Sequence, residues 1–471
     1  MYNIKSTKSS EFMDNEEIEA TLRYAEENRE NRALIRRILE KAGEAKGLPH
    51  REAAVLLACA DEELNREILA LARRLKEAFY GSRVVMFAPL YLSNYCVNGC
   101  AYCPYHVGNK RIPRKKLTQE EIAAEAEALQ DMGHKRLALE AGEDPVNNPI
   151  DYILDSIRTI YSARHKNGAI RRANVNIAAT TEENYAKLRN AGIGTYILFQ
   201  ETYNRENYEK LHLSGPKSGY AWHTEAMDRA MRAGVDDVGL GALFGLSGYK
   251  YEFAGLLMHT EHLEAVFGVG AHTISVPRVR PADDVDSNRF QGGLSDEAFA
   301  KLVACIRVAA PYAGIIISTR ENEETRARLL SVGVSQISGG SRTGVGSYAG
   351  GAGSKNTEQF EISDDRSLEE VVAWLIDSGH IPSFCTACYR EGRTGDRFMS
   401  LCKSGQIHNC CTPNALLTLR EYLLDYAGPS VRAAGEALIE SEAGKVPNLK
   451  AREVLSKRLK EVSAGARDLR F

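Results

Sequence analysis

The spacing of apolar and polar positions along the chain changes near residue 83. Before residue 80, apolar residues recur at helical spacing, as at Ile35 and Leu39. From Arg83 onward, short runs rich in β-branched residues alternate with amphipathic segments, which is typical of strand–helix–strand units and a parallel sheet. The pattern therefore predicts an N-terminal helical segment at residues 1–82 and an α/β domain after it.

Eight strands are predicted in the α/β part, with amphipathic helices between them. Two of these helices begin with capping-box patterns, at Thr118 and at Thr180. Eight such units over roughly 260 residues fit a closed (βα)8 TIM barrel at residues 83–342. A six-unit partial barrel is the alternative, and the last two strands decide between them. The predicted strands span residues 84–88, 136–140, 173–177, 195–200, 237–241, 273–276, 314–317 and 336–339.

The remaining residues, 343–471, are predicted to form a C-terminal helical domain. Apolar residues return to helical spacing at 371–376, 416–426 and 450–462. This part of the chain also carries five of the ten cysteines. The fold class we expect is therefore an α/β barrel with helical segments on both sides of it in sequence.

Charge and composition narrow the choice of partners and compartment. The net charge is -3 with 26% charged residues, which gives no global field for nucleic acid or for an anionic membrane. The basic run at residues 111–116 has no interleaved aromatic residues, and we interpret it as a solvated loop. No apolar run approaches the length of a membrane span, and clustered cysteines suit metal binding in a reducing compartment. We expect a cytoplasmic protein.

The first cysteine group, Cys96, Cys100 and Cys103, directly follows the first predicted strand. Three thiolates at this spacing can hold one [4Fe-4S] cube and leave its fourth iron open. A zinc site with His106 as fourth ligand, or a set of buried thiols, are the alternatives. Reactive groups of (βα)8 barrels lie on loops after the strands, so the position fits a functional site.

The segment from Cys96 to Cys103 closely resembles the cluster loop of the radical S-adenosylmethionine (radical SAM) family. The resemblance implies that the open iron binds the amino and carboxylate groups of SAM, and that an electron then releases methionine and a 5'-deoxyadenosyl radical. It implies that Tyr102 lies against the adenine. Gly142 and Glu143 would form the turn that meets the methionine amine, although the first glycine of that family turn is Ala141 here.

Two further segments resemble the aromatic amino acid lyase branch of this family. They are Gln200-Glu201-Thr202-Tyr203 and the glycine-rich run at residues 238–246. The branch includes the thiamine-pathway tyrosine lyase (ThiH) and the [FeFe]-hydrogenase maturase (HydG). The resemblance implies that Glu201 binds the SAM amine or ribose, whereas an ordinary solvated carboxylate is the alternative.

Members of this branch hold an amino acid substrate by its carboxylate, for which an arginine is the natural partner. Arg320, directly after the seventh predicted strand, is our first choice, and Ser338 on the eighth strand would add a hydrogen bond. Arg278 and Arg280, after the sixth strand, are assigned to SAM or to an ion pair. The resemblance implies removal of hydrogen from the L-tyrosine amino group, followed by Cα–Cβ cleavage to dehydroglycine and a p-cresol precursor.

The second cysteine group resembles the C-terminal cluster pattern of the HydG family when Cys385 and Cys388 are combined with Cys411. The doublet Cys410-Cys411 leaves this register open by one, and a zinc ribbon is the alternative. The thiamine-pathway relative lacks this extension. The same resemblance implies that His272, which precedes the sixth strand, helps to hold an extra iron on an auxiliary iron-sulfur cluster, although single histidines near strands are ordinarily structural.

Together these features give one hypothesis with two alternatives. The hypothesis is a tyrosine lyase with a [4Fe-4S] cluster and SAM at one end of the barrel and an auxiliary iron-sulfur cluster with an additional iron at the other. Dehydroglycine would cross a polar tunnel and yield CO and cyanide for the [FeFe]-hydrogenase active site. A reductant protein such as ferredoxin or flavodoxin and other hydrogenase maturation proteins are the expected partners. The alternatives are a tyrosine lyase for thiamine thiazole synthesis and a non-catalytic iron-sulfur scaffold.

Overall fold

Eight parallel strands form a closed barrel in the computed structural model, which describes residues 1–286, 289–290, 293–350 and 356–471. Each strand pairs with the next, and the eighth pairs with the first, which closes the ring. The strands are β1 (Arg83–Ser93), β2 (Arg136–Ala141), β3 (Arg172–Asn176), β4 (Tyr196–Ile197), β5 (Val238–Gly241), β6 (Thr273–Ser275), β7 (Gly314–Ile317) and β8 (Gln336–Ser338).

The eight-unit prediction is confirmed, and the six-unit alternative is wrong. The last two strands pair in register, with Ile316 opposite Gln336, and β8 returns to β1 through Met86 and Ile337. The strand β4 is shorter than predicted, but its hydrogen bonding to β5 continues through the amide of Leu198. The barrel is therefore complete.

Helices cover the outside of the barrel between the strands. The predicted capping box at Thr118 is present, because its side chain accepts from the Glu121 amide and the Glu121 carboxylate accepts from Thr118. The second helix start was predicted one residue too early: Thr181, not Thr180, is the N-cap. The helices are α6 (Gln119–Met132), α7 (Ile150–Ser162), α8 (Glu182–Asn190), α9 (Arg205–Leu211), α10 (Tyr220–Thr224), α11 (Ala226–Arg232), α12 (Tyr249–Phe267), α13 (Asp296–Ala309) and α14 (Glu323–Val332).

The N-terminal segment is helical, as predicted. Its long helix α5 packs against α13 and α14 of the barrel, and α2 packs against α12. Its apolar face, which includes Leu64, Ile68 and Leu71, is buried at these contacts. The helices are α1 (Ser9–Phe12), α2 (Asn15–Glu27), α3 (Arg32–Gly43), α4 (His50–Ala58) and α5 (Glu62–Tyr80).

The C-terminal part contains the three predicted helices, α15, α18 and α20, together with three helices and one strand that were not predicted. This strand, β9 (Ile381–Ser383), pairs with the first residues of β1, and three residues with a central proline are too short to be found from sequence. The helices are α15 (Leu368–Asp377), α16 (Ala387–Arg390), α17 (Gly395–Lys403), α18 (His408–Asp425), α19 (Pro429–Ala443) and α20 (Leu449–Ser463).

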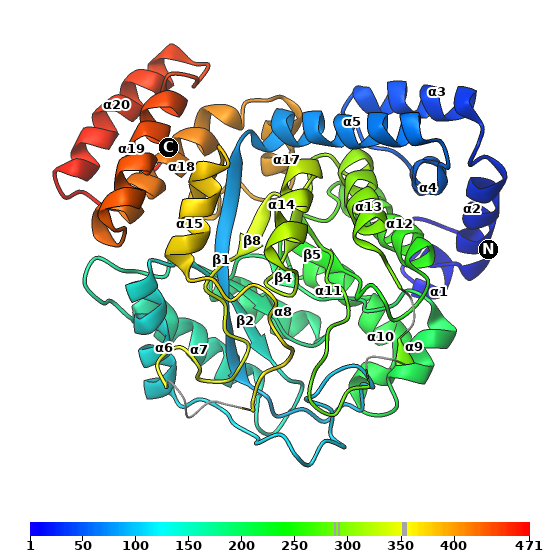
Figure 1. The fold of residues 1–471 in the computed structure, drawn as a ribbon. Coiled ribbons are helices and arrows are strands. Elements are labelled where there is room, and N and C mark those ends of the chain that lie inside the picture. Colours follow the sequence, from blue (N-terminus) through cyan, green and yellow to red (C-terminus); the bar gives the residue numbers. More distant parts are fainter. Residues whose placement is uncertain (287–288, 291–292, 351–355) are drawn as a thin grey trace.

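The two ends of the barrel carry different parts of the chain. In Figure 1, β1 runs downward, so the strands end at the lower side, where the loop that follows β1 lies. At the upper side, where the strands begin, α17 and α18 lie beside the end of α5. No helix of the described residues is long and apolar enough to cross a membrane. We call the two sides the carboxyl end and the amino end of the barrel.

Candidate functional site

A cavity of about 1100 Å³ lies at the carboxyl end and brings together most of the predicted site residues. Its wall is formed by the loop after β1 and by the ends of β2, β4, β6 and β7. The predicted residues on this wall are Cys96, Cys100, Cys103, Tyr102, Gly142, Glu143, Glu201, Arg280 and Arg320.

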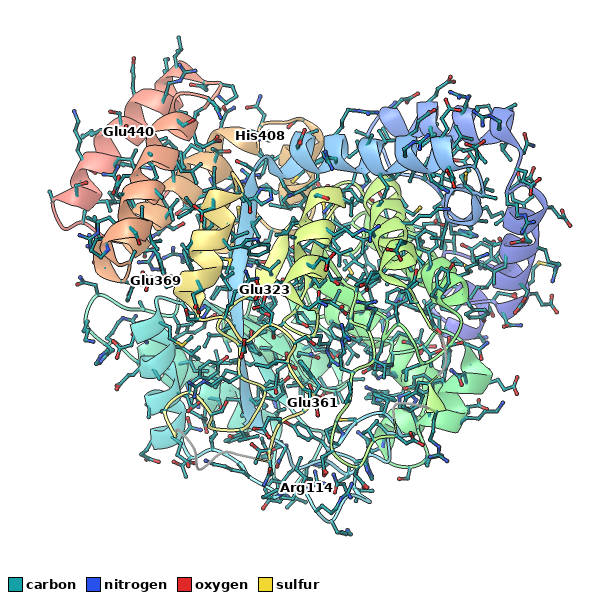
Figure 2. All side chains as sticks on the ribbon, in the orientation of Figure 1. Arg114, Glu323, Glu361, Glu369, His408 and Glu440 are labelled. Carbon is teal, nitrogen blue, oxygen red and sulfur yellow. The ribbon has the colours of Figure 1, made fainter. Side chains whose placement is uncertain are left out.

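One guanidinium group binds both halves of the cysteine loop. Arg114 donates hydrogen bonds to the carbonyl oxygens of Asn94 at 2.7 Å, Tyr105 at 2.8 Å, His106 at 2.7 Å and Asn109 at 3.3 Å. Figure 2 labels Arg114 at this end of the molecule. Because one side chain joins both halves of the loop, the three thiols have a fixed backbone frame. No sequence signal identified this residue.

Tyr102 is fixed by a neutral histidine. Burial lowers the pKa of His212 to about 3, and its Nδ1 lies 2.8 Å from the carbonyl oxygen of Tyr208, so this nitrogen donates. Nε2 is then the acceptor, and it lies 2.7 Å from the Tyr102 hydroxyl. The ring of Tyr102 is thereby held in one orientation beside the cysteines.

Glu201 sits at a strained backbone position and is paired with a lysine that the sequence analysis missed. Its φ of 66° lies in the left-handed region, which non-glycine residues rarely occupy. The carboxylate lies 2.9 Å from Lys217 Nζ. Burial opposes the charge on Lys217, but Glu201 and the nearby Cys100 thiol raise its pKa above the ordinary value.

The buried carboxyl group of Glu252 accepts two hydrogen bonds from the turn after Glu201. It accepts from the Thr202 hydroxyl and from the Tyr203 amide, the latter at 2.7 Å. Glu252 is fully buried, and burial raises its pKa to about 7. These bonds offset part of the strain at Glu201 and fix the direction of its side chain.

The turn after β2 matches the geometry expected for a close approach to the cysteine loop. A Cβ on Gly142 would lie 2.3 Å from the Tyr95 carbonyl oxygen, so no other residue fits. The neighbouring Glu143 accepts from Asn98 Nδ2 at 2.6 Å, and burial raises its pKa. The predicted pair Gly142 and Glu143 therefore lies directly on the loop that carries Cys96 and Cys100.

The carboxyl-end cavity continues into the barrel as a second space of about 710 Å³, where Arg320 and Ser338 meet. The Arg320 guanidinium stacks on Phe360 with its Cζ 3.5 Å from the ring centre. Among the described residues it forms no ion pair, and burial lowers its pKa. Glu140 lines the same space, and burial raises its pKa to about 8. This space thus offers an arginine without a carboxylate partner next to a neutral acid.

The two arginines after β6 are placed differently. Arg278 does not line the cavity, because its guanidinium pairs with Glu321 and with Asp296, the latter at 2.7 Å. Arg280 lines the cavity and also pairs with Glu321, at 2.5 Å. Only Arg280 is therefore positioned to meet a ligand.

A separate cavity of about 740 Å³ at the amino end contains the second group of predicted residues. Cys385 follows β9, Cys388 lies in α16, Cys411 lies in the first turn of α18, and His272 precedes β6. Cys388 and Cys411 both line this cavity. This cavity shares no lining residue with either space at the carboxyl end.

The two cysteines of the doublet differ in position because of the phase of α18. Successive residues of a helix point about 100° apart. The structure places Cys411 on the cavity wall and leaves Cys410 off it, while Cys402 of α17 also lines the cavity. This placement favours the register with Cys411.

Buried cations and a tyrosine close the barrel next to this cavity, and the sequence analysis missed them. Arg136 and Arg172, at the first positions of β2 and β3, are each 7% exposed. The guanidinium of Arg172 stacks on Tyr389, with 3.2 Å from Cζ to the ring centre. The Tyr389 hydroxyl lies 3.1 Å from Thr195 Oγ1 and 3.4 Å from His272 Nε2. The ring therefore stands between the amino-end cavity and the barrel interior.

Both cysteine groups have the thiol donors that an iron-sulfur cluster uses. Among the described residues, no three His, Cys, Asp or Glu side chains converge closely enough to hold one metal ion. A zinc ion needs all its ligands at about 2.0–2.3 Å, whereas the cysteines of a cluster bind different irons and stand farther apart. The proposed fourth zinc ligand, His106, instead lies 3.2 Å from Asp284.

The amino-end cavity also contains polar atoms that lack a hydrogen-bond partner among the described residues. They include His272 Nδ1, Asp237 Oδ2 and the Nε atoms of Arg136 and Arg393. Asp237 Oδ1 lies 3.4 Å from His272 Nδ1, close enough for attraction but without hydrogen-bond geometry. Buried polar groups are almost always satisfied, so this cavity is suited to a polar or metal-containing group.

The comparisons with known proteins agree with this geometry. A family model described as the Radical SAM superfamily matches residues 90–257, and one described as the Biotin and Thiamin Synthesis associated domain matches residues 275–381. The crystal structure of HydG, a maturase of the [FeFe]-hydrogenase, is 54% identical with a TM-score of 0.95, covering 98% of this chain and 100% of that chain.

Two other relatives are less similar. The X-ray structure of HydG from Carboxydothermus hydrogenoformans is 39% identical with a TM-score of 0.82, covering 96% of this chain and 99% of that chain. The 2-iminoacetate synthase of Escherichia coli strain K12 is 32% identical over 349 residues, which are 73% of this chain and 89% of that protein.

Proposed function

Because this chain belongs to the HydG family of radical SAM [FeFe]-hydrogenase maturases, we propose that it is a tyrosine lyase acting in assembly of the hydrogenase H-cluster. The observation that carries the proposal is the placement of two cysteine triplets at opposite ends of one closed barrel. A lyase with one cluster needs only the first triplet.

The residues at the carboxyl end would hold the radical-generating group. When bound, a [4Fe-4S] cluster supplies the electron that cleaves SAM to methionine and a 5'-deoxyadenosyl radical. Cys96, Cys100 and Cys103 would be its ligands, and Tyr102 would lie against the adenine. Glu143 would meet the SAM amine and Glu201 the amine or ribose, and Lys217 orients the Glu201 carboxylate through its 2.9 Å ion pair.

Arg320 is proposed to bind the substrate carboxylate. Its guanidinium lines the inner space and has no carboxylate partner among the described residues. Stacking on the ring of Phe360 fixes its orientation. Ser338 lines the same space and would add one hydrogen bond. This space lies within the ring of strands, so a substrate bound there would be confined next to the site where the radical would form.

The amino-end cavity is proposed to hold the auxiliary cluster and its additional iron. When bound, this group supplies the open iron positions that capture CO and cyanide. Cys385, Cys388 and Cys411 would hold the cluster. His272 would turn one ring nitrogen toward the additional iron, since burial lowers its pKa and Nδ1 has no hydrogen-bond partner among the described residues. A reductant protein and other hydrogenase maturation proteins remain the proposed partners.

The experiment that tests the proposal uses the purified chain reconstituted with iron and sulfide under anaerobic conditions. With SAM, dithionite and L-tyrosine, we expect 5'-deoxyadenosine and p-cresol, together with infrared bands of iron-bound CO and cyanide. Absence of p-cresol contradicts the lyase function. Formation of p-cresol without the infrared bands instead favours a lyase that releases the fragment, as expected for a 2-iminoacetate synthase.

A further inference from the structure

Tyr389 connects two of the predicted metal ligands at the amino end of the barrel. It directly follows Cys388 in α16, and its hydroxyl lies 3.4 Å from Nε2 of His272, which precedes β6 and lines the same cavity. The proposed function uses Cys388 and His272 but gives no role to the tyrosine between them. A side chain in this place can determine how the histidine ring is turned.

The ring and the hydroxyl of Tyr389 are held by residues at the start of three barrel strands. The Arg172 guanidinium stacks on the ring, with Cζ 3.2 Å from its centre, and the Arg136 Cζ lies 5.7 Å from that centre. The hydroxyl lies 3.1 Å from Oγ1 of Thr195, a buried residue directly before β4. Tyr389 is therefore anchored to the barrel as well as to α16.

The ring of His272 is confined, and its two nitrogens have different surroundings. The rings of Tyr389 and Phe398 are its aromatic neighbours, with centroid distances of 6.2 Å and 4.9 Å. Nε2 faces the Tyr389 hydroxyl, whereas Nδ1 has no hydrogen-bond partner among the described residues. One nitrogen is thus next to a polar partner, and the other is available.

The tyrosine hydroxyl is able to accept a hydrogen bond from the histidine. A neutral imidazole has one N–H and one lone pair, and only the lone pair binds a metal. The hydroxyl hydrogen of Tyr389 can go to Thr195 Oγ1, so the oxygen is free to accept from Nε2–H of His272. Nδ1 then carries the lone pair. Histidines that bind metals commonly donate their other N–H to an oxygen atom, which fixes the tautomer and the ring.

Asp237 is the competing partner for the same ring. Its Oδ1 lies 3.4 Å from His272 Nδ1 without hydrogen-bond geometry, and it accepts from the Gly395 amide at 3.0 Å. If Asp237 held the ring through Nδ1–H, Nε2 would have to bind the metal, but the Tyr389 hydroxyl lies against Nε2. The geometry therefore favours the tyrosine.

We propose that Tyr389 is a positioning residue for His272: its hydroxyl accepts a hydrogen bond from Nε2 and so directs Nδ1 toward the additional iron. The inference rests on the proposed function and adds to it a residue that acts through the histidine. Loss of such a partner typically lowers metal affinity by about 10- to 100-fold. Tyr389 would thus determine how firmly the additional iron is held.

The test measures the binding of ferrous iron by the full chain, which is reconstituted with iron and sulfide and then treated with a mild chelator. Tyr389→Phe keeps the ring on Arg172 and removes only the hydroxyl. We expect its Kd for iron to be about tenfold above that of wild type, with an unchanged sulfide content. Tyr185→Phe is the matched control, because Tyr185 is fully buried, donates to Tyr196 at 3.0 Å and lines neither cysteine cavity.

A double-variant comparison separates positioning from support of the fold. His272→Ala should raise the Kd for iron more than Tyr389→Phe does. Adding Tyr389→Phe to His272→Ala should have no further effect, because the hydroxyl acts through the imidazole. Thr195→Val removes the partner of the hydroxyl and should weaken iron binding about threefold, and Thr195→Ser should restore it.

Three results are decisive. An unchanged Kd in Tyr389→Phe, or a loss that adds fully to that of His272→Ala, would overturn the proposal. Weaker iron binding in Asp237→Asn without any loss in Tyr389→Phe would also overturn it, because the carboxylate would then hold the ring. If the wild-type chain binds no iron beyond its clusters, the proposed function fails instead.

Discussion

The two cysteine-lined cavities lie at opposite ends of one barrel and are built in different ways. At the carboxyl end, the ligand-bearing loop follows β1 and is bound by Arg114, and Glu201 is paired with Lys217, whereas Arg320 has no carboxylate partner among the described residues. At the amino end, the cysteines come from short elements after the barrel, and several buried polar atoms lack hydrogen-bond partners among the described residues. In the first cavity, hydrogen bonds and an ion pair within the chain fix several of the lining side chains. In the second cavity, the unpartnered polar atoms would gain partners only from a bound group.

This difference predicts opposite effects for one cysteine substitution in each cavity. Cys100→Ser should lower p-cresol formation by at least about a thousandfold, because the radical-generating group loses a ligand. Cys388→Ser should leave p-cresol within about threefold of wild type and abolish the infrared bands of iron-bound CO and cyanide. Product chromatography and infrared spectroscopy measure both.

Cys305→Ser is the matched control for this pair, since Cys305 is fully buried in α13 away from both cavities. Iron content should fall in the two cavity variants and stay at the wild-type level in the control. Loss of p-cresol in Cys388→Ser to the extent seen in Cys100→Ser would contradict the separation of the two sites.

Arg320 sharpens the comparison within the carboxyl-end half. Arg320→Gln should raise the KM for tyrosine about a hundredfold, equivalent to about 2.7 kcal/mol, because a charge-assisted pair with the substrate carboxylate is lost. The Kd for SAM should stay within about twofold. Steady-state kinetics and SAM binding measure the two quantities separately. Arg328→Gln is the control, as an exposed arginine paired with Glu297 at 2.9 Å. A larger effect on SAM than on tyrosine would move Arg320 into the SAM site.

The smallest expected effect concerns Glu252, which supports the turn after Glu201. Burial raises its pKa to about 7 in the folded protein, so the native state prefers the protonated acid. Its contribution to stability is present below the ordinary pKa of about 4.5 and is lost as pH rises through about 7. Glu252→Gln mimics the neutral acid and should reduce the fall in the free energy of unfolding between about pH 5 and pH 8 by 1–3 kcal/mol.

Denaturant unfolding of the wild type and the variant at several pH values measures this difference. The exposed Glu27 on α2 provides the control substitution Glu27→Gln, which should leave the pH dependence unchanged. A pH dependence that is the same in wild type and Glu252→Gln would show that this carboxyl group titrates at its ordinary value.

The barrel was predictable because its strands carry a strong local signal. The run that forms β7, Gly314–Ile317, is β-branched and bounded by helical periods, and its predicted limits match the structure. The strand β9 was missed, since Ile381–Ser383 is short, contains a proline and is defined by pairing with β1, which is distant in sequence. Local sequence patterns therefore predict a strand such as β7, whose own residues favour it, but not a strand such as β9, which depends on pairing with a distant segment.

The candidate sites show the same division. The spacing of the first cysteine group predicts its function from sequence alone, as for Cys96, Cys100 and Cys103. In contrast, Lys217 is a single lysine in a loop. Its ion pair with Glu201 depends on the path of the chain after β4, which the sequence does not reveal. The polar tunnel between the two cavities stays a prediction. At the amino end of the barrel, where β7 and β8 begin, a Cβ on Gly314 would lie 2.3 Å from Gln336 Nε2, so the space between these two residues is tightly filled.

The strand β1 is hydrogen-bonded at its start to β9, which leads to Cys385, and it ends at the loop that carries Cys96. Its length therefore sets a distance between the two ends of the barrel. The ten residue-to-residue intervals from Arg83 to Ser93, at ~3.3 Å each, span ~33 Å. Deleting one residue from it would rotate the following side chains to the opposite face and shift both metal-binding halves at once. The length of this one strand thus couples the position of Cys96 to that of Cys385.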